Sequence, residues 1–179
     1  NNLLYTTGGI LENIAPPSSS TIVVYQERIF LLTEDGSLWY SKKKQVGQPV
    51  EFTDSFVKSL SNTDGRVLGL GVIDSNFILF RATKIETFSG QGPNNVGVGD
   101  DYGDPQFVTS DTGCSNPNSI GTTPNGLIFD SPKGRYLLDR SLQASYIGAP
   151  VEDYNDLTVT SSALLSTKNE IRFLTLENI

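Results

Sequence analysis

Residues 28–40 read RIFLLTEDGSLWY, from Arg28 to Tyr40. An apolar run, a polar turn centred on Asp35-Gly36 and a second apolar run follow one another in this stretch. β-Branched and aromatic residues favour strands, and Asp-Gly between two apolar runs is typical of a hairpin in which the glycine takes a positive φ. The stretch therefore predicts two antiparallel strands joined by a tight turn.

The same order of strand, polar turn and strand returns further along the chain. It is present in Phe77–Phe88 (FILFRATKIETF) and in Leu127–Leu138 (LIFDSPKGRYLL), and Glu170–Leu176 begins in the same way. One isoleucine anchors each copy, at intervals of 49, 50 and 43 residues: Ile29, Ile78, Ile128 and Ile171. A period of about 40 to 50 residues with several strands per repeat is typical of a β-propeller, one four-stranded blade per repeat.

We therefore predict an all-β fold, and more specifically a β-propeller, with a β-sandwich as the alternative. About three to four blades are visible, and propellers typically close with about 4 to 8. The blade-like units cover about residues 20–65, 66–117 and 118–159, with a partial one over 160–179. Because the chain contains no Met, we expect residues 1–179 to be one propeller segment of a longer protein, unless four blades close a small ring.

Individual strands and turns follow from local composition. Short β-branched and aromatic runs predict these strands: Thr21–Tyr25, Arg28–Thr33, Ser37–Ser41, Phe77–Phe80, Ile85–Ser89, Gly126–Asp130, Tyr136–Asp139 and Glu170–Leu176. Clusters of Pro, Asn, Asp and Gly predict turns at Pro124–Gly126 and Asp130–Gly134, and more weakly at Lys168-Asn169. Gly90–Asp104 is predicted to be a long loop, and Asp54–Ser61 either a helical turn or a strand.

The composition excludes several classes of function. The chain has no His, which excludes a Ser-His-Asp triad and His-ligated zinc, and its single cysteine, Cys114, excludes an internal disulfide and a cysteine-rich metal cluster. A net charge of -7 and a pI near 4.5 argue against sequence-specific nucleic acid binding. No apolar run approaches the roughly 20 residues that span a bilayer, so we expect no membrane insertion.

Acidic side chains supply two candidate sites. Asp100, Asp101 and Asp104 lie in the Gly-rich loop and have the oxygen ligands that calcium prefers, although Asp is also common in loops for turn formation alone. Asp111, near Cys114, and the neighbours Glu152 and Asp153 have the chemistry of paired glycosidase acids, but nothing in the sequence sets their separation. We therefore predict no catalytic residue, cofactor or metal site, and leave calcium at the Gly-rich loop open.

Aromatic and basic residues supply further candidates, each with a structural alternative. Trp39, Tyr40, Tyr136 and Tyr146 have side chains that can stack on sugars, but strand positions favour packing roles, notably for Trp39 and Tyr136. We expect Cys114 to be a small buried or half-buried residue and Asp139-Arg140 to form an ion pair that ties one blade to the next. The cluster Lys42–Lys44 fits a solvated strand end better than a phosphate site.

Several segments resemble a β-propeller protein of tailed-phage virions. In the second half these are Ser110–Ile120 (SDTGCSNPNSI), Thr123–Phe129 (TPNGLIF), Lys133–Arg140 (KGRYLLDR) and Tyr146–Asn155 (YIGAPVEDYN). In the first half, Leu4–Asn13 (LYTTGGILEN) resembles the entry to the propeller, and Phe80–Asn94 (FRATKIETFSGQGPN) resembles its second blade with the loop after it. The chain is most similar to the tail nozzle or tail-hub protein of short-tailed (podovirus-type) phages.

The resemblance implies a non-enzymatic virion structural protein of the phage tail. Such a protein assembles as a homo-oligomeric ring of about six subunits around the DNA exit channel. Its expected partners are the portal or adaptor above it and tail-fibre proteins, and its location is the virion. The alternative is a receptor- or carbohydrate-binding propeller, and a glycan-degrading enzyme is disfavoured by the lack of His. Exposed aromatic residues gathered on one loop rim would favour sugar binding, whereas contacts along outer strands would favour assembly.

Overall fold

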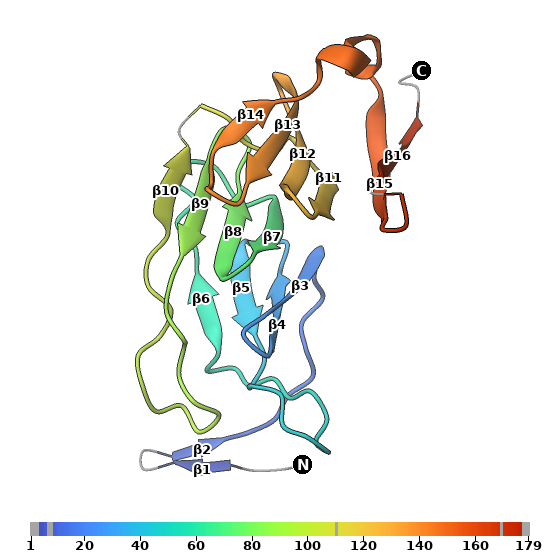
Figure 1. Cartoon of the computed structure of the whole chain (residues 1–179). Coiled ribbons are helices and arrows are strands. Elements are labelled where there is room, and N and C mark those ends of the chain that lie inside the picture. The colour runs from blue at the N-terminus through green and yellow to red at the C-terminus, as the bar shows by residue number, and fades with distance from the viewer. Residues whose placement is uncertain (1–3, 7–8, 110, 169, 177–179) are drawn as a thin grey trace. The chain divides into compact units, whose positions relative to one another are not determined.

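The computed structural model describes residues 4–6, 9–109, 111–168 and 170–176, and this part of the chain is all-β (Figure 1). Its strands form three four-stranded and two two-stranded antiparallel sheets, so the predicted fold class is confirmed at that level. A 3-10 helix, η1 (Ala149–Tyr154), joins two of the sheets. Within the described residues, no helix has the length and apolar character needed to cross a membrane.

The chain divides into two compact units. The first comprises Asn1–Asn62 and Phe88–Pro105, and the second comprises Thr63–Thr87 and Gln106–Ile179. In every four-stranded sheet the strands lie side by side in chain order, which is the up-and-down arrangement that short hairpin turns produce.

The first unit is built on one such sheet and a separate hairpin. The sheet contains β3 (Thr21–Tyr25), β4 (Arg28–Leu32), β5 (Ser37–Tyr40) and β6 (Val57–Ser59), and the hairpin contains β1 (Leu4–Thr6) and β2 (Gly9–Leu11). Gly36 has φ of 85°, as the predicted β4–β5 hairpin requires. For Asp54–Ser61, the strand alternative is the one found, as β6.

The Gly-rich loop Gly90–Asp104 carries no strand, as predicted, and it is anchored to this sheet by buried groups. Arg28 is 1% exposed, and its guanidinium donates from Nη1 to the Ser41 carbonyl at 2.7 Å and from Nη2 to the Pro93 carbonyl. Tyr102, from the loop, packs edge-on against Phe30 with ring centroids 5.4 Å apart. Burial raises the pKa of Tyr102 to about 12. The loop thereby completes the core of the first unit.

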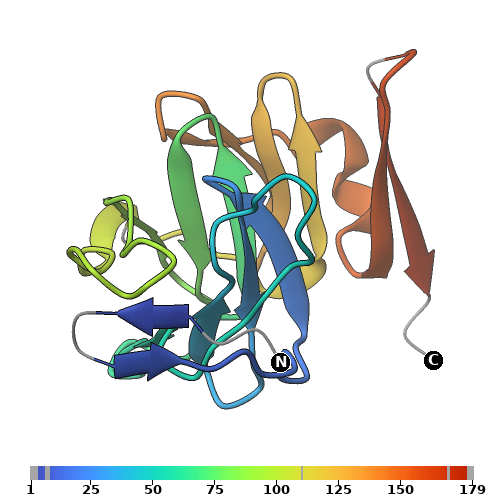
Figure 2. The ribbon, with the colours of Figure 1, turned by 90° about the horizontal axis from the view of Figure 1, so that it is seen from below.

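The second unit contains two four-stranded sheets and a two-stranded hairpin. The first sheet is β7 (Gly69–Ile73), β8 (Asn76–Phe80), β9 (Ile85–Phe88) and β10 (Gln106–Thr109). The second is β11 (Asn116–Thr123), β12 (Gly126–Ser131), β13 (Gly134–Asp139) and β14 (Ala144–Tyr146), and the hairpin is β15 (Thr158–Leu165) with β16 (Glu170–Leu176). Strand β11 lies between β7 and β15, as the view in Figure 2 shows.

Consecutive sheets of the second unit meet through the same contact. A Cβ built on Gly71 of β7 would lie 2.4 Å from Cδ1 of Leu127 of β12, and one built on Gly121 of β11 would lie 2.1 Å from Cδ1 of Ile171 of β16. In both cases the glycine is on the first strand of one sheet and the aliphatic side chain is on the second strand of the next. Only glycine leaves room for this approach.

The four isoleucine anchors occupy the second strand of each hairpin, but the alignment through them is wrong by one residue. Each second strand begins at the residue paired across the turn, in the pairs Tyr25–Arg28, Ile73–Asn76, Thr123–Gly126 and Leu165–Glu170. Counted from there, Ile29 and Ile171 are the second residue of their strand, and Ile78 and Ile128 are the third. Successive residues of a strand point to opposite faces. Ile78 and Ile128 therefore face the following sheet, whereas Ile171 faces the preceding one.

The eight predicted strands are all present within a residue or two of their expected ends. Strands that escaped prediction are short, Gly-containing or polar: β1, β2, β7, β10, β11, β14 and β15. The turns at Pro124–Gly126 and Asp130–Gly134 are confirmed, with φ of 142° at Gly126 and 108° at Gly134. Asn169 of the expected turn Lys168-Asn169 and residues 177–179 of the last blade-like unit lie outside the described residues. The same holds for Thr7, Gly8 and Ser110 of the segments quoted for the resemblance.

Replacing Gly71 tests the contact between consecutive sheets. Gly71→Ala places a methyl group within 2.4 Å of Leu127, so we expect a loss of about 1–3 kcal/mol of unfolding free energy in urea titrations. Leu127→Ala alone should cost about 2–5 kcal/mol through the cavity it leaves.

The double variant separates steric conflict from a general glycine effect. The double variant Gly71→Ala, Leu127→Ala should lose about 1 kcal/mol less unfolding free energy than the sum of the single changes, because the shorter side chain at position 127 no longer overlaps the methyl group at position 71. Gly103→Ala is the matched control, since its added Cβ would lie 3.5 Å from the nearest atom. Additive effects, or an equal loss in the control, would contradict the close contact.

Candidate functional site

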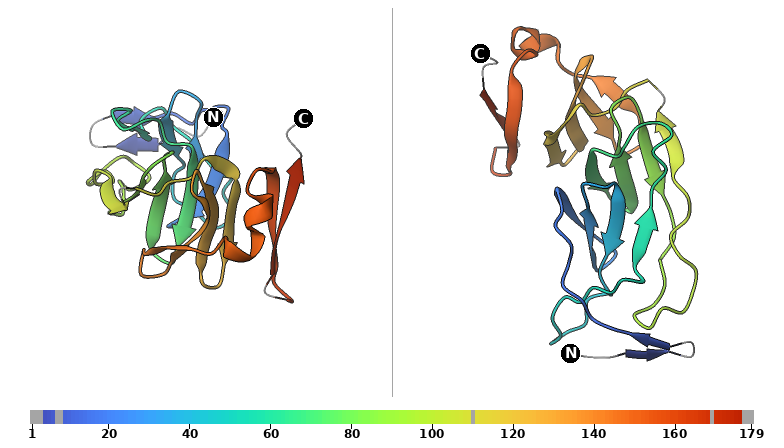
Figure 3. Two further views of the ribbon diagram at one scale, coloured as in Figure 1. Left: turned by 90° about the horizontal axis from the view of Figure 1, so that it is seen from above. Right: turned by 180° about the vertical axis from the view of Figure 1, so that it is seen from behind.

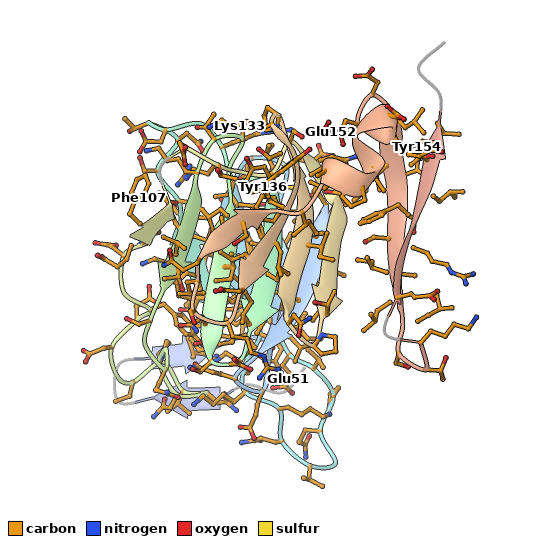
Figure 4. All side chains as sticks on the ribbon, turned by 45° about the horizontal axis from the view of Figure 1, so that its top comes forward. Glu51, Phe107, Lys133, Tyr136, Glu152 and Tyr154 are labelled. Atoms are coloured by element: carbon orange, nitrogen blue, oxygen red, sulfur yellow. The ribbon has the colours of Figure 1, made fainter. Side chains whose placement is uncertain are left out.

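A polar cleft of about 670 Å³ is hollowed into the second unit. It lies between the β12–β13 turn and the chain that follows η1, and Figure 4 shows Lys133 on the first of these and Glu152 and Tyr154 on η1. Amide, hydroxyl and charged side chains predominate among its walls: Asn116, Asn118, Asp130, Lys133, Asn155 and Asp156. Such a lining suits a ligand with many hydroxyl or amide groups.

Asp130, one of the residues that line the cleft, forms a largely buried ion pair with Arg135. Nε of Arg135 lies 3.1 Å from Oδ1 of Asp130, and the two side chains are 9% and 17% exposed. The guanidinium also lies 5.1 Å from the ring centroid of Phe173 on β16. Burial raises the pKa of Asp130, and the attraction of Arg135 opposes that rise. Because it also contacts β16, Arg135 links the cleft to the neighbouring hairpin.

Two further contacts involve the cleft or residues next to it. Nδ2 of Asn116 donates to the Val159 carbonyl at 2.6 Å, which holds β11 to β15. The hydroxyl of Tyr146 donates to Glu152 at 2.7 Å, and the ring packs edge-on against Tyr136 with centroids 5.5 Å apart. Tyr146 is 39% exposed, and its ring edge approaches Gly134, one of the residues in the cleft wall.

The acids that the sequence offered as a glycosidase pair bond to different partners. Asp111 lies 3.2 Å from Nζ of Lys133, in an exposed ion pair, and Glu152 accepts the hydrogen bond of Tyr146. Asp153 is exposed on η1. Asp111 and Glu152 thus each bond to a different partner, Lys133 and Tyr146.

The carboxylates of the Gly-rich loop tie that loop to the first sheet. Oδ1 of Asp101 accepts hydrogen bonds from the hydroxyl of Tyr40 and the backbone N–H of Tyr102, each at 2.7 Å. Asp104 lies 3.5 Å from Nζ of Lys58, and Asp100 is exposed. Within the described ranges, no group of three or more His, Cys, Asp or Glu residues is arranged to hold a metal ion.

Most of the aromatic candidates pack inside the sheets. Tyr40 is 2% exposed and stacks on Phe56, with centroids 5.2 Å apart, while Tyr136 is half-buried and stacks on Phe129 at 6.1 Å. Trp39 is half-buried on β5. The described aromatic side chains that are well exposed lie on the outer strands β10 and β14 and on η1: Phe107, Tyr146 and Tyr154.

Cys114, Asp139 and Arg140 make contacts within and between the sheets. Cys114 is fully buried, as expected, and burial raises the pKa of its thiol to about 11. Arg140 does tie one sheet to the next, but its partner is Asp74 in the β7–β8 turn, at 3.4 Å. Asp139 instead accepts backbone hydrogen bonds within its own turn, from Ser141 and Gln143. Pairing within Asp139-Arg140 was therefore the wrong prediction.

The prediction of a solvated Lys42–Lys44 cluster is wrong for its first member. Lys42 is 3% exposed, lies 3.6 Å from Glu51 and donates to the side chain of Asn13. Lys44, by contrast, is exposed. Lys42 thus forms an ion pair inside the first unit, because a buried ammonium group needs an acidic partner.

The cleft itself escaped the sequence analysis. Asn155 lies about forty residues after Asn116 and Asn118, and asparagine in a polar stretch is also typical of turns. Glycines in strand interiors were the one available signal for close packing of the sheets, since glycine weakens a strand unless another chain segment approaches it.

Comparison with known proteins adds no relative. The sequence matches no model of a known protein family, and no curated protein matches it significantly. The likeness to phage tail propellers therefore rests on the segments quoted from this sequence alone.

The titration of Asp130 supplies a test of the burial of its carboxyl group. Because folding raises its pKa, the folded state holds the proton more tightly, and this contribution to stability is complete below the ordinary pKa of 3.8. It is lost as the pH rises through the higher pKa of the folded state. The advantage of the wild type over Asp130→Asn should therefore be smaller at pH 7 than at pH 3, measured by urea unfolding. An advantage that grows with pH would contradict the burial of this carboxyl.

Proposed function

We propose that this chain is a β-propeller segment of a virion protein and that it serves a non-enzymatic, structural role in the tail of a short-tailed phage. The observation that carries the propeller part is the repeated contact between consecutive sheets. The β11–β14 sheet has the β7–β10 sheet against one face and the β15–β16 hairpin against the other, through Gly71–Leu127 and Gly121–Ile171. A sandwich packs two sheets through one face each, whereas a propeller packs each blade on both faces.

The contacts among the first strands of the sheets in the second unit also support a propeller. Strand β11 contacts β7 and β15, which are the first strands of the sheets on either side of it. The fourth strands, β10 and β14, are edge strands of their sheets. First strands gathered near an axis and fourth strands on the outside are the arrangement of propeller blades.

The role in a tail rests on the resemblance and on where exposed aromatic residues lie. Phe107 and Tyr146 are on the outer strands β10 and β14, and Tyr154 is on η1. Two of these three residues are on outer strands, which favours docking to neighbouring subunits. We propose that the protein forms a homo-oligomeric ring of about six copies at the DNA exit channel, in contact with the portal or adaptor and with tail fibres.

The test is the location and assembly state of the native protein. Virions of the phage that encodes the chain are purified, their tails are released, and native mass spectrometry is combined with peptide identification. We expect peptides of this chain in the tail fraction, within a ring of about six copies. A stable monomer of 19.4 kDa that is absent from purified virions would overturn the proposal.

A second candidate function, receptor or carbohydrate binding, is favoured by the polar cleft. Its asparagine, lysine and aspartate side chains are groups that hydrogen-bond to sugars, and the ring of Tyr146, which approaches Gly134 of the cleft wall, can stack on one. Host surface glycans are the ligand class that this lining fits.

Glycan-array binding followed by calorimetry separates this function from assembly. If the cleft binds a glycan, Asn155→Ala and Lys133→Ala should each weaken binding by about 3- to 10-fold, through one lost hydrogen bond. Lys44→Ala, an exposed lysine of the other unit, is the control and should leave affinity unchanged. Equal affinity in all variants would exclude the cleft as the binding site.

A further inference from the structure

Ion pairs neutralise charged groups that line the polar cleft. Among the described residues in its wall, Lys133 is the only cation, and Asp130 and Asp156 are the carboxylates. Lys133 and Asp130 each have a partner outside the lining, Asp111 for the first and Arg135 for the second. The charge that a ligand would meet in the cleft therefore depends on two residues that do not form its wall.

The ammonium group of Lys133 is bonded to Asp111. Nζ of Lys133 lies 3.2 Å from Oδ2 of Asp111, and the two side chains are 52% and 74% exposed. The hydrogen bond from Lys133 holds the pKa of Asp111 below its ordinary value of 3.8, so this carboxylate is ionised at neutral pH. An anionic ligand would have to compete with the carboxylate of Asp111 for the ammonium group.

The balance of charge at the cleft is negative. With Asp156 in the wall, the two ion pairs bring the total to two cations and three carboxylates, which carry one net negative charge. Glu152 adds a carboxylate next to the wall, because Tyr146, to which it bonds at 2.7 Å, approaches Gly134. Like charges brought together cost binding free energy, so this balance disfavours anionic ligands.

The uncharged part of the wall both donates and accepts hydrogen bonds. Asn118 and Asn155 are exposed, and an amide side chain has two donors and one acceptor oxygen. The two sides of the cleft come close at Asn155, whose Nδ2 would lie 3.2 Å from a Cβ built on Gly134. Figure 3 shows η1, which ends just before Asn155, between the β11–β14 sheet and the β15–β16 hairpin. Sugar hydroxyls are also both donors and acceptors, so this lining matches an uncharged sugar.

We propose that the cleft binds uncharged sugars and rejects acidic ones, and that Asp111 sets this preference by neutralising Lys133. The cleft volume of about 670 Å³ is within the range of small-ligand pockets, about 300–1,000 Å³. The inference rests on the second candidate function, glycan binding at the cleft, and names the class of glycan. Asp111 acts through Lys133 and is a positioning residue. Selectivity of this kind comes from a group that opposes the wrong ligand.

The experiment compares neutral glycans with their acidic counterparts. The 179-residue chain is screened on an array of neutral glycans and of the same glycans with sialic or uronic acid groups, and pairs such as lactose and sialyllactose are titrated by calorimetry. We expect the wild type to bind the neutral member at least about 10-fold more tightly. Asp111→Asn leaves the ammonium group without its carboxylate. The ratio of the two dissociation constants should therefore move towards the acidic member by about 3- to 10-fold.

Two further variants separate the cation of the cleft from a general change in charge. Asp74→Asn is the matched control, because Asp74 is 51% exposed and forms an ion pair with Arg140 elsewhere on the same unit, so the ratio should stay at the wild-type value. Asp111→Asn combined with Lys133→Ala should lose the shift, since the ammonium group is absent. Added NaCl should weaken the binding of the acidic glycan to Asp111→Asn more than that of the neutral one, because salt screens the new attraction. Circular dichroism checks that each variant is folded.

A wild type that binds acidic glycans as tightly as neutral ones, through a site that Asn155→Ala weakens, would overturn the inference and leave glycan binding at the cleft intact. A ratio that Asp111→Asn does not change, or that Asp74→Asn changes equally, would also overturn it. Absence of binding to every glycan on the array would refute the glycan-binding function and this inference with it. None of these results bears on the structural role in the tail, which the virion experiment tests separately.

Discussion

The second unit depends on how closely its sheets approach one another. Two glycines, Gly71 and Gly121, lie where any larger residue would overlap an aliphatic side chain of the next sheet. Since the sheets meet at the same register twice, the second contact repeats the geometry of the first. Packing of this density leaves little freedom in sheet spacing, because interiors fill space almost as fully as organic crystals.

Several polar contacts of the second unit follow from that spacing. Arg140 reaches Asp74 on the preceding sheet, Asn116 reaches the Val159 carbonyl on the following hairpin, and Arg135 lies against the ring of Phe173. The polar cleft occurs where the β12–β13 turn and the chain after η1 diverge beyond these contacts. The cleft therefore depends on contacts between sheets, whereas the Asp130–Arg135 ion pair is local, because the two residues are cross-strand partners in the β12–β13 hairpin.

The core of the first unit is formed by a sheet and a loop rather than by stacked sheets. Its sheet is completed by a long loop, which contributes Tyr102 to the core and the Pro93 carbonyl to Arg28. The guanidinium of Arg28 also lies over the rings of Tyr40 and Phe56, 5.4 and 5.3 Å from their centroids. Arginine is suited to such a position because its planar group stacks on aromatic rings while donating in the plane. Burial lowers the pKa of Arg28, which is the cost of this arrangement.

The sequence by itself determined the all-β class, the repeated hairpins and the glycine-assisted turns, because these depend on local propensity and on alternation along a strand. It also placed Cys114 in the interior and Gly90–Asp104 in a loop. It did not determine which residues of the repeat are equivalent, since an isoleucine one position along a strand looks the same in sequence but faces the opposite side. The burial of Lys42, the pairing of Arg140 with Asp74 and the residues of the cleft were decided only by tertiary structure, because each joins segments far apart in the chain.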